Sequence, residues 1–401
     1  MNKPKIRFNG FEGEWKEKAL GDVVDEFKYG INAAAVSYDG ENKYLRITDI
    51  DEGSRAFIKD ELASPDADLS SCNEYIMQDG DIVIARTGAS VGKSYIYHPI
   101  DGKVYFAGFL IRARVNKNVD REFVFQNTLT DGFKKYIRFV SQRSGQPGVN
   151  AEELKSYLMN LPASLPEQRA LASYFTSLDA QIAASTSRLS SLKQIKAASL
   201  LNMFPQKGET VPRVRFNGFQ GEWKERKLGE IAIVNPKCDL PKSFEYVDLE
   251  SVVGTEMKSH RREFRESAPS RAQRLARKGD IFYQTVRPYQ KNNYLFNLDY
   301  SDYVFSSGYA QIQALKDERF LFTVVQSDYF LKQVMDNCTG TSFPSINPTL
   351  LRNLIVYDCS IDEQRAIGQY FTTLDAQITL HRERLEKLKQ IKAACLEKMF
   401  A

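Results

Sequence analysis

The chain has 401 residues, of which 42% are hydrophobic and 26% charged, and its formal net charge is +4. This length allows two or three domains that each bury a core, and the composition excludes a mainly disordered chain. No stretch approaches the ~20 apolar residues that span a bilayer, and the N-terminal residues lack the apolar run of a signal peptide. The five cysteines lie far apart without a Cys-x-x-Cys pair, and only three histidines are present. We therefore expect a cytoplasmic protein without a membrane segment, a metal site or histidine-dependent catalysis.

The chain contains an internal repeat. Residues 6–23 and 214–231 are identical at twelve of eighteen positions, residues 167–182 and 363–378 at twelve of sixteen, and residues 192–204 and 388–400 at ten of thirteen. The inserts between these segments, 24–150 and 232–347, share only a Gly-Asp-Ile and a weak similarity of 144–150 to 339–347. A similar framework around unlike inserts indicates two modules that do one task on two targets. The alternative, an old duplication with drifting loops, fits poorly because loops of this size are rare.

The segment 166–203 and its counterpart in the second copy are predicted to form long helices. Pro166 suits the first helical turn, and apolar residues recur at alternating steps of four and three, with Ser185 and His381 at the skipped places. This spacing indicates a heptad seam made of Leu171, Phe175, Leu178, Ile182, Leu189, Leu192, Ile367, Phe371, Leu374, Ile378, Leu385 and Leu388. Equivalent places in the repeat predict an antiparallel pair with pseudo-two-fold symmetry, each helix ~57 Å long. The order of the repeated segments is that of a circle opened between Phe400 and Arg7.

The inserts are predicted to be compact domains of strands with a helix near the end. Runs rich in β-branched and aromatic residues indicate strands at 43–50, 80–87, 93–98 and 107–115, and at 281–289, 292–300 and 308–315. The helices are expected at 123–139 and 320–337. The predicted fold class is therefore α+β, with two globular domains joined by two long antiparallel coiled-coil helices.

Charge is unevenly distributed within the inserts. Residues 25–81 carry 5 basic and 14 acidic residues, whereas residues 86–143 carry 11 and 4, and residues 258–291 carry 10 and 3. Such a local basic excess suits a phosphate backbone, and arginine can also read guanine edges. The alternative is an ordinary solvated charged face, and the duplicated architecture favours nucleic acid over it. The candidate DNA-contacting residues are Arg86, Thr87, Lys93, Ser94, Arg112, Arg114, Arg143, Arg261, Arg262, Arg265, Arg274, Gln284, Arg287 and Lys291.

Catalytic motifs were sought and rejected. Residues 86–94 resemble a phosphate-binding loop, but Thr87 stands where the first glycine is required, and a strand is predicted where a helix should follow. The Asp/Asn-Pro-Pro-aromatic motif of amino-methyltransferases is absent, as are the hydrolase and deaminase signatures. Asp49 and Asp51 lie in an acidic stretch with no partner base. We expect no catalytic residue, no metal ligand and no cofactor bound by this chain.

The paired segments resemble the specificity subunit of a type I restriction–modification enzyme. The resemblance rests on LPEQRALASYFTSLDAQI and IDEQRAIGQYFTTLDAQI, on their LKQIKAA continuations, and on the paired RFNGFxGEWKExxLG segments. It also rests on the inserts with GDIVIARTGASVGK and GDIFYQTVRPYQ, and it covers essentially the whole chain. The second insert departs from the common form, because Thr285-Val286-Arg287 follows Gly-Asp-Ile-Phe-Tyr-Gln there.

The resemblance implies two target recognition domains, at 1–150 and 211–350, and two helical spacers, at 151–210 and 351–401. Each recognition domain would read one half of a bipartite, asymmetric site in double-stranded DNA, and the helices would set the gap between the halves. Two methyltransferase subunits would dock on the helical framework, with its exposed helix residues and Trp15 and Trp223 as candidates, and two restriction subunits can join. S-adenosylmethionine, ATP and Mg²⁺ are then expected on those partners.

Two alternatives come from other classes. A fused methylase or ATPase would need the motifs that are absent. A coiled-coil scaffold that reads no DNA would show no salt-dependent DNA binding, and the two basic stretches argue against it.

Overall fold

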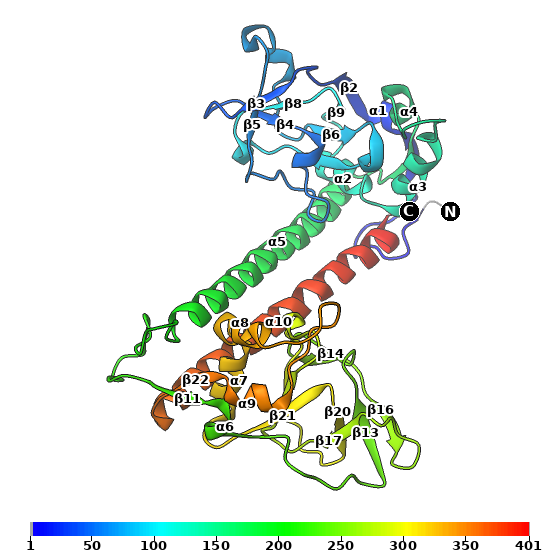
Figure 1. Cartoon of the computed structure of the whole chain (residues 1–401). Coiled ribbons are helices and arrows are strands. Elements are labelled where there is room, and N and C mark those ends of the chain that lie inside the picture. The colour runs from blue at the N-terminus through cyan, green and yellow to red at the C-terminus, as the bar shows by residue number, and fades with distance from the viewer. Residues whose placement is uncertain (1–2, 401) are drawn as a thin grey trace. The chain divides into compact units, whose positions relative to one another are not determined.

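The computed structural model describes residues 3–400, and the chain divides into two compact units. The first unit combines residues 1–187 with 382–401, and the second comprises residues 188–381. Two long helices, α5 (Leu165–Asn202) and α10 (Ile361–Met399), each contribute a part to both units (Figure 1). The long helix predicted over 166–203 is therefore confirmed, together with its counterpart. None of the described helices is long and apolar enough to cross a membrane.

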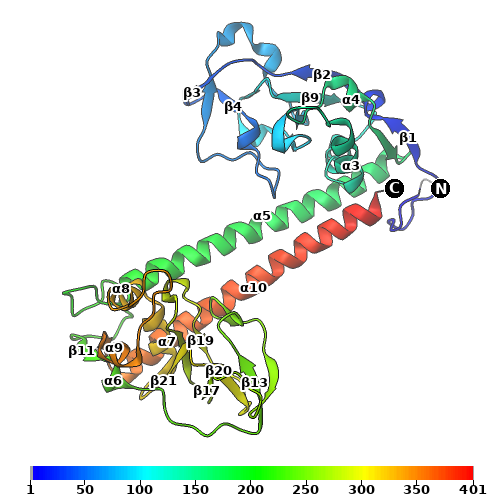
Figure 2. The ribbon, with the colours of Figure 1, turned by 45° about the vertical axis from the view of Figure 1, so that its right-hand side comes forward.

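The first unit is built on a four-stranded antiparallel sheet. Its strands, in spatial order, are β2 (Val24–Tyr29), β9 (Leu110–Val115), β6 (Ile82–Ala85) and β7 (Ser94–Ile96). Three further pairs are β1 (Lys16–Ala19) with β10 (Leu158–Leu161), β3 (Ala35–Ser37) with β5 (Ala63–Pro65), and the parallel pair β4 (Lys43–Leu45) and β8 (Val104–Phe106). The short helices are α1 (Leu20–Val23), α2 (Arg121–Asn127), α3 (Asp131–Val140) and α4 (Ala151–Lys155). Figure 2 shows α3 and α4 next to the start of α5.

The second unit repeats this plan and extends it. Its matching sheet has the order β12 (Ala232–Val234), β21 (Tyr309–Ala314), β18 (Ile281–Gln284) and β19 (Tyr294–Leu295), and β11 (Lys224–Lys227) pairs with β22 (Ile355–Asp358). A second sheet has the order β16 (Arg261–Phe264), β13 (Ser243–Val247), β20 (Tyr303–Ser306) and β17 (Ala272–Leu275). Its parallel centre, β13 with β20, is the counterpart of β4 with β8. The remaining elements are β14 (Val252–Val253), β15 (Glu256–Met257), α6 (Leu228–Ile231), α7 (Glu318–Gln326), α8 (Asp328–Asp336) and α9 (Pro348–Asn353).

The end of each insert holds two helices where the sequence predicted one. The helix expected over 123–139 is divided into α2 and α3, and the one over 320–337 into α7 and α8. The division falls at a capping side chain in each case. The hydroxyl of Thr130 accepts the N–H of Phe133 at 3.3 Å, and that of Ser327 accepts the N–H of Phe330 at 3.2 Å. A capping residue has an extended backbone, so one continuous helix cannot pass through it.

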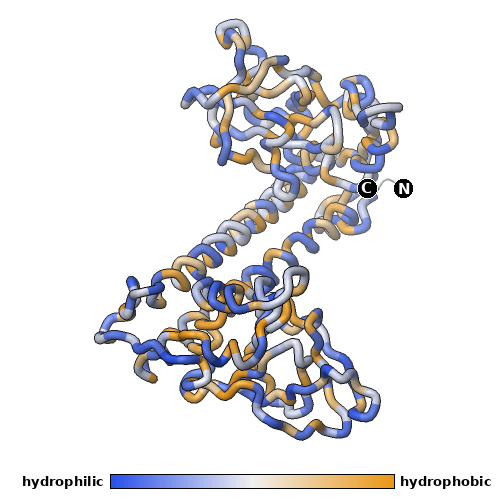
Figure 3. Tube along the Cα trace, in the orientation of Figure 1, coloured by the Kyte–Doolittle hydropathy of each residue, from blue (hydrophilic) through white to orange (hydrophobic). Residues whose placement is uncertain are grey.

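Both long helices bury the predicted seam. Nine of its twelve residues are buried, and Ile182, Ile378 and Leu388 are partly buried. In the first unit Asp179 pairs with Lys392 at 2.5 Å, and the rings of Phe175 and Phe400 are 5.5 Å apart. Positions therefore fall along α5 as they rise along α10, which confirms the antiparallel pairing. The equivalent contacts in the second unit join Asp375 to Lys196 at 2.5 Å and Phe371 to Phe204 at 6.0 Å. Polar and apolar residues alternate along both helices, as this one-sided burial requires (Figure 3).

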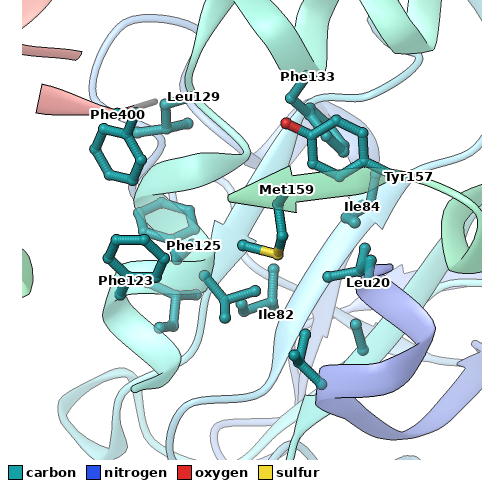
Figure 4. Packing of buried hydrophobic residues seen from close by; sticks show 14 of the residues in the cluster. Leu20, Ile82, Ile84, Phe123, Phe125, Leu129, Phe133, Tyr157, Met159 and Phe400 are labelled. Carbon is teal, nitrogen blue, oxygen red and sulfur yellow. The ribbon is translucent and has the colours of Figure 1, made fainter. Parts of the chain in front are cut away.

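A phenylalanine one or two residues beyond the end of each long helix completes a core. Phe400 stacks on Phe123 of α2 with 5.2 Å between ring centroids, and both rings lie in the cluster shown in Figure 4. In the second unit Phe204 lies 5.9 Å from Phe320 of α7. Both phenylalanines are at most 8% exposed. The packing of the helix pair and that of the recognition domain are therefore continuous within each unit.

Two buried ion pairs fasten the repeated RFNGF segments to the long helices. Glu167 of α5 accepts hydrogen bonds from Arg7 at 2.7 and 2.8 Å, and Glu363 of α10 accepts them from Arg215 at 2.6 and 2.7 Å. The carboxylates are 2% and 1% exposed. A buried carboxylate needs a charged, bidentate partner of this kind, which explains why Arg and Glu are kept in both copies of the repeat.

The tryptophans of these segments are core residues. Trp15 and Trp223 are each 2% exposed. The indole N–H of Trp15 donates to Glu167 at 3.2 Å, whereas that of Trp223 has no hydrogen-bond partner among the described residues. The expectation that these two side chains face a methyltransferase is therefore wrong, because neither is at the surface.

The circular order of the repeat has a direct counterpart in backbone hydrogen bonds. The N–H of Ile6 donates to the carbonyl of Lys398 at 2.9 Å, and the N–H of Val214 donates to the carbonyl of Asn202 at 2.9 Å. The last turn of a long helix thus holds an RFNGF segment in both units. In the second unit the chain runs directly from one to the other, and in the first it does not.

Candidate nucleic-acid interface

A carboxylate directly before β6, in the Gly-Asp-Ile of the first domain, organises two of the candidate arginines. Asp81 is 2% exposed and accepts hydrogen bonds from Arg114 at 2.8 and 2.9 Å, which raises the pKa of that guanidinium. Arg112 is 1% exposed and is held by Glu26 and by the carbonyl of Glu74 at 2.9 Å. A guanidinium enclosed in this way has no surface to offer DNA. We therefore assign Arg112 to the sheet. The side chain of Arg114 is 30% exposed, but Asp81 takes both of its hydrogen bonds, and we leave both arginines out of the contact set proposed below.

The second domain treats the equivalent carboxylate differently. Asp280 is also 2% exposed, but its side-chain donors are the amides of Gln311 at 2.5 Å and Gln313 at 2.9 Å, and it also accepts the backbone N–H of Arg277 at 2.8 Å. Gln311 and Gln313 occupy the β21 positions that Arg112 and Arg114 occupy in β9. Burial raises the pKa of Asp280 above its usual value and outweighs the hydrogen bonds and the charge of Arg277, which lower it.

Lys93 and Ser94 lie at the start of β7. Ser94 is 1% exposed and shares a hydrogen bond of 2.7 Å with Thr128. Lys93 donates to the carbonyl of Ile50 at 3.0 Å and lines a hollow of about 330 Å³. This hollow also contains the side chains of Arg55, Lys134 and Arg138, which sequence reasoning did not select. The structure therefore joins Lys93 to basic residues from two other segments, the loop of Arg55 and helix α3, and places Ser94 inside the domain.

Two loops meet at the end of the Gly-Asp-Ile strand in each domain. We call residues 86–88 and 285–287 the strand-end loops, and residues 144–148 and 341–345 the facing loops. They share two backbone hydrogen bonds per domain: Gly88 to Pro147 at 2.9 Å and Val149 to Arg86 at 2.8 Å, then Arg287 to Pro344 at 2.8 Å and Ile346 to Thr285 at 3.1 Å. Isolated bridges join Thr87 to Gly148 and Val286 to Ser345. The backbone framework is thus the same in both domains, although the side chains on it differ.

The strand-end loop of the first domain presents Arg86 and Thr87. The guanidinium of Arg86 lies 4.8 Å from the ring centre of Tyr29, and its Nε has no partner in the described part of the chain. Both residues are half-buried, so their outer atoms reach solvent. Arg143 precedes the facing loop, is exposed, and pairs with Glu153 at 2.5 Å. These side chains are brought to one edge of the sheet, near the facing loop.

The strand-end loop of the second domain ends in Arg287, which has a left-handed backbone with φ of 53°. A residue with a side chain in this conformation is strained by roughly 1–2 kcal/mol. Its guanidinium lies 4.4 Å from the ring centre of Phe343, which is 60% exposed. Gln284, at the end of β18, is 2% exposed, and its Oε1 has no partner among the described residues. All three line a hollow of about 600 Å³.

Lys291 and the arginines of the second sheet lie on separate surfaces. Lys291 donates to Asp328 at 2.6 Å. Arg261 and Arg262 sit on the edge strand β16 with half-exposed side chains, paired with acidic neighbours at 2.7–3.0 Å. Arg265 is exposed and donates to a backbone carbonyl, and burial lowers the pKa of Arg274 on β17. The basic excess of this stretch is therefore largely compensated by nearby carboxylates.

The facing loops were missed as candidate sites. Gln146 and Phe343 carry no charge and lie 58 and 56 residues after the residue each one faces, Gly88 and Arg287, so no local pattern connects them. The one available signal was the weak similarity of 144–150 to 339–347, which indicated that both inserts keep this loop.

A family model, a curated relative and a solved structure all match this chain along most of its length. A model of the type I restriction modification DNA specificity domain matches residues 12–194 and 220–390. The specificity subunit of the type I restriction enzyme MjaVIII from Methanocaldococcus jannaschii is 21% identical over 417 residues, covering 94% of this chain and 90% of that protein. The crystal structure of the S subunit of a type I restriction–modification system from M. genitalium has a TM-score of 0.68 at 15% identity and covers 100% of this chain and 99% of that one, so it has the same fold. Each matched segment contains one Gly-Asp-Ile strand and one facing loop.

Proposed function

The chain belongs to the family of type I restriction–modification DNA specificity subunits, and we propose that each of its two domains reads one half of a split DNA site. One observation carries this proposal: both domains keep the same backbone framework at the strand-end and facing loops but place unlike side chains on it. Unlike side chains on one framework are what two different half-sites require, because bases are read by the donors and acceptors of side chains.

The contact set separates into two kinds. Arg86, Thr87 and Arg287 lie in the strand-end loops and are proposed to read bases. Gln284 is buried, but its Oε1 has no partner among the described residues and it lines the hollow beside Arg287, so it is proposed to accept a hydrogen bond from a base that enters this hollow. Lys93, Arg143, Arg261, Arg262, Arg265, Arg274 and Lys291 are proposed to hold phosphates. Their pairing with surface carboxylates does not oppose this role, because exposed ion pairs contribute only about 0–1 kcal/mol and phosphates can replace the partner.

The long helices are proposed to bind two methyltransferase subunits. Ile195 of α5 and Ile391 of α10 hold equivalent places in the repeated LKQIKAA and remain 44% and 37% exposed. An exposed isoleucine that recurs at both places suits two copies of the same partner, since each copy can bury one of them. The partners would supply S-adenosylmethionine for adenine methylation, and restriction subunits, where they join, would supply the steps that use ATP and Mg²⁺.

The test is the pattern of methylated adenine in a host that expresses this chain with its methyltransferase, compared with a host that expresses the methyltransferase alone. We expect a new split motif with a fixed gap. Replacing residues 24–150 by the corresponding insert of another specificity subunit should change one half of the motif and leave the other half and the gap intact.

Two results would contradict the proposal. Methylation that is the same with and without this chain would mean that it does not direct the enzyme. A change in both halves after the single replacement would mean that the domains do not read separate halves. A non-reading coiled-coil scaffold, the alternative, predicts no salt-dependent binding of DNA by the complex.

A further inference from the structure

We propose that one pair of side chains in each domain determines specificity: Gly88 with Gln146 in the first, and Arg287 with Phe343 in the second. This inference rests on the proposed reading of one half-site by each domain, and it names where the reading is decided. Arg287 is assigned to a G·C pair in the second half-site, and Gln146 to an A·T pair in the first. Neither facing-loop residue carries a charge, so a role limited to phosphate binding does not account for the pair.

The two pairs occupy the same place. Gly88 and Arg287 are the third residues of the strand-end loops, and both have a left-handed backbone, with φ of 74° and 53°. Both donate their N–H to the proline of the facing loop, and Gln146 and Phe343 directly precede that proline. A Cβ on Gly88 would lie 2.7 Å from the amide nitrogen of Gln146, just as the side chain of Arg287 meets Phe343.

Within each pair, the side chain of one residue suits the side chain, or its absence, at the other. Where the strand-end residue lacks a side chain, the facing residue is a glutamine whose amide lies over the empty position. Where the strand-end residue is arginine, the facing residue is an aromatic ring that supports the guanidinium plane. Each domain thus presents one polar head at this point: an amide in the first and a guanidinium in the second.

The two heads match different bases. A guanidinium makes two hydrogen bonds to O6 and N7 of guanine, and a glutamine amide makes two to N6 and N7 of adenine. The second domain has further unused capacity beside its head, since Oε1 of the buried Gln284 lacks a partner and lines the same hollow as Arg287, Gln290 and Asn292. A left-handed arginine persists although glycine would relax it, which also points to a function for the side chain.

The decisive experiment installs the pair of the first domain in the second. In the complex with the methyltransferase, the double variant Arg287→Gly with Phe343→Gln is expected to lose preference for G·C at one position of the second half-site by about 10- to 100-fold. The first half-site should stay unchanged. The melting temperature should not fall, because glycine relieves the left-handed strain. Tyr300→Gln, which replaces a 64% exposed aromatic ring of the same domain, is the matched control and should leave the motif intact.

Three outcomes overturn the inference. An unchanged motif in the folded double variant would show that the pair does not decide specificity. Equal weakening on all sequences would show a phosphate contact, and a change in the first half-site would show that the pair is not local. If the double variant does not accumulate, the motif of Arg287→Lys is measured instead. Lysine keeps the charge but cannot make the bidentate hydrogen bonds, so the preference at the same position should be relaxed.

Failure of this inference and failure of the proposed function give different results. If replacing residues 24–150 changes one half of the motif while the Arg287 variants change nothing, only the assignment of the pair fails. If that replacement changes nothing, the reading of one half-site by each domain fails with it.

Discussion

The two recognition domains bury an equivalent aspartate directly before equivalent strands, but its hydrogen-bond partners differ in charge. In the first domain Asp81 meets the guanidinium of Arg114, with Arg112 close by, and in the second domain Asp280 meets two glutamine amides. The first arrangement is an ionic network, and the second is a carboxyl group among neutral donors. The backbone framework therefore requires a hydrogen-bond acceptor at this place, and the charge around it is free to vary.

The difference should separate the two domains most strongly when the acid is removed. Asp81→Asn leaves Arg112 and Arg114 facing a neutral amide inside the sheet, and we expect a loss of about 3–5 kcal/mol in the free energy of unfolding of the first unit. Asp280→Asn strands no charge, so its expected cost is about 1 kcal/mol or less. Urea unfolding followed by tryptophan fluorescence can assign each loss, because Trp15 and Trp223 lie in different units and each can be replaced by phenylalanine. Equal losses for the two variants would contradict the ionic description of the first domain.

The buried ion pairs at the helix starts should show a smaller contrast. Glu167→Gln and Glu363→Gln each remove the charge that Arg7 or Arg215 meets, and we expect about 3 kcal/mol of destabilisation for Glu363→Gln. Glu167→Gln should cost about 1 kcal/mol more, because it also weakens the acceptor of the Trp15 indole. The same urea titration measures both. A larger loss for Glu363→Gln would show that the indole bond adds nothing.

The helix surface should show no contrast at all between the two copies. Ile195→Asp and Ile391→Asp place a charge on equivalent exposed positions, and each should weaken binding of one methyltransferase subunit about tenfold. Titration calorimetry should then resolve one strong and one weak site for either single variant. Leu380→Asp, at a 63% exposed position of α10 whose counterpart in the repeat is Ala184, is the control and should leave both sites intact.

The smallest expected effect is the pH dependence of the second domain. The native pKa of Asp280 is raised by burial, so the folded state keeps its proton to a higher pH than the unfolded state. Stability from this group is therefore full at low pH and falls as the pH rises from about 4 through the native pKa. The stability difference between the wild-type chain and Asp280→Asn should shift in that direction across this range. A shift of opposite sign would mean that the amides of Gln311 and Gln313 outweigh burial.

The repeated helices could be predicted from the sequence, whereas features that depend on contacts between strands could not. The long helices and their seam follow from local periodicity, so Leu171 and Ile367 were placed correctly. Arg112 was selected for its charge. It is buried because it pairs with Glu26 of β2 and Asp81, which directly precedes β6, and the sequence does not show these contacts. The break between α2 and α3 was missed because Thr130 reads as an ordinary helix residue until its hydroxyl is seen to cap Phe133.

The strand-end and facing loops show that a sequence can also leave a candidate residue unrecognised. Composition predicted the basic stretches as nucleic-acid contacts, and this stays a prediction, whereas Phe343 and Gln146 were identified only once the fold brought them to Arg287 and Gly88. A residue selected for reading one base pair needs no particular charge and no fixed distance along the chain. Its place is defined by the backbone bonds that hold its loop, and a single sequence does not display these.

The backbone hydrogen bonds from Ile6 to Lys398 and from Val214 to Asn202 are equivalent. The contact between a long helix and an RFNGF segment is therefore the same whether or not the two are neighbours in the sequence. One RFNGF segment follows its helix closely in the sequence, and the other is held at the equivalent helix by a residue far from it in the sequence. A gene rewritten to begin with the second module and end with the first would therefore specify the same set of contacts. If each module reads one half-site as proposed, the order of the modules along the chain is expected to leave that reading unchanged.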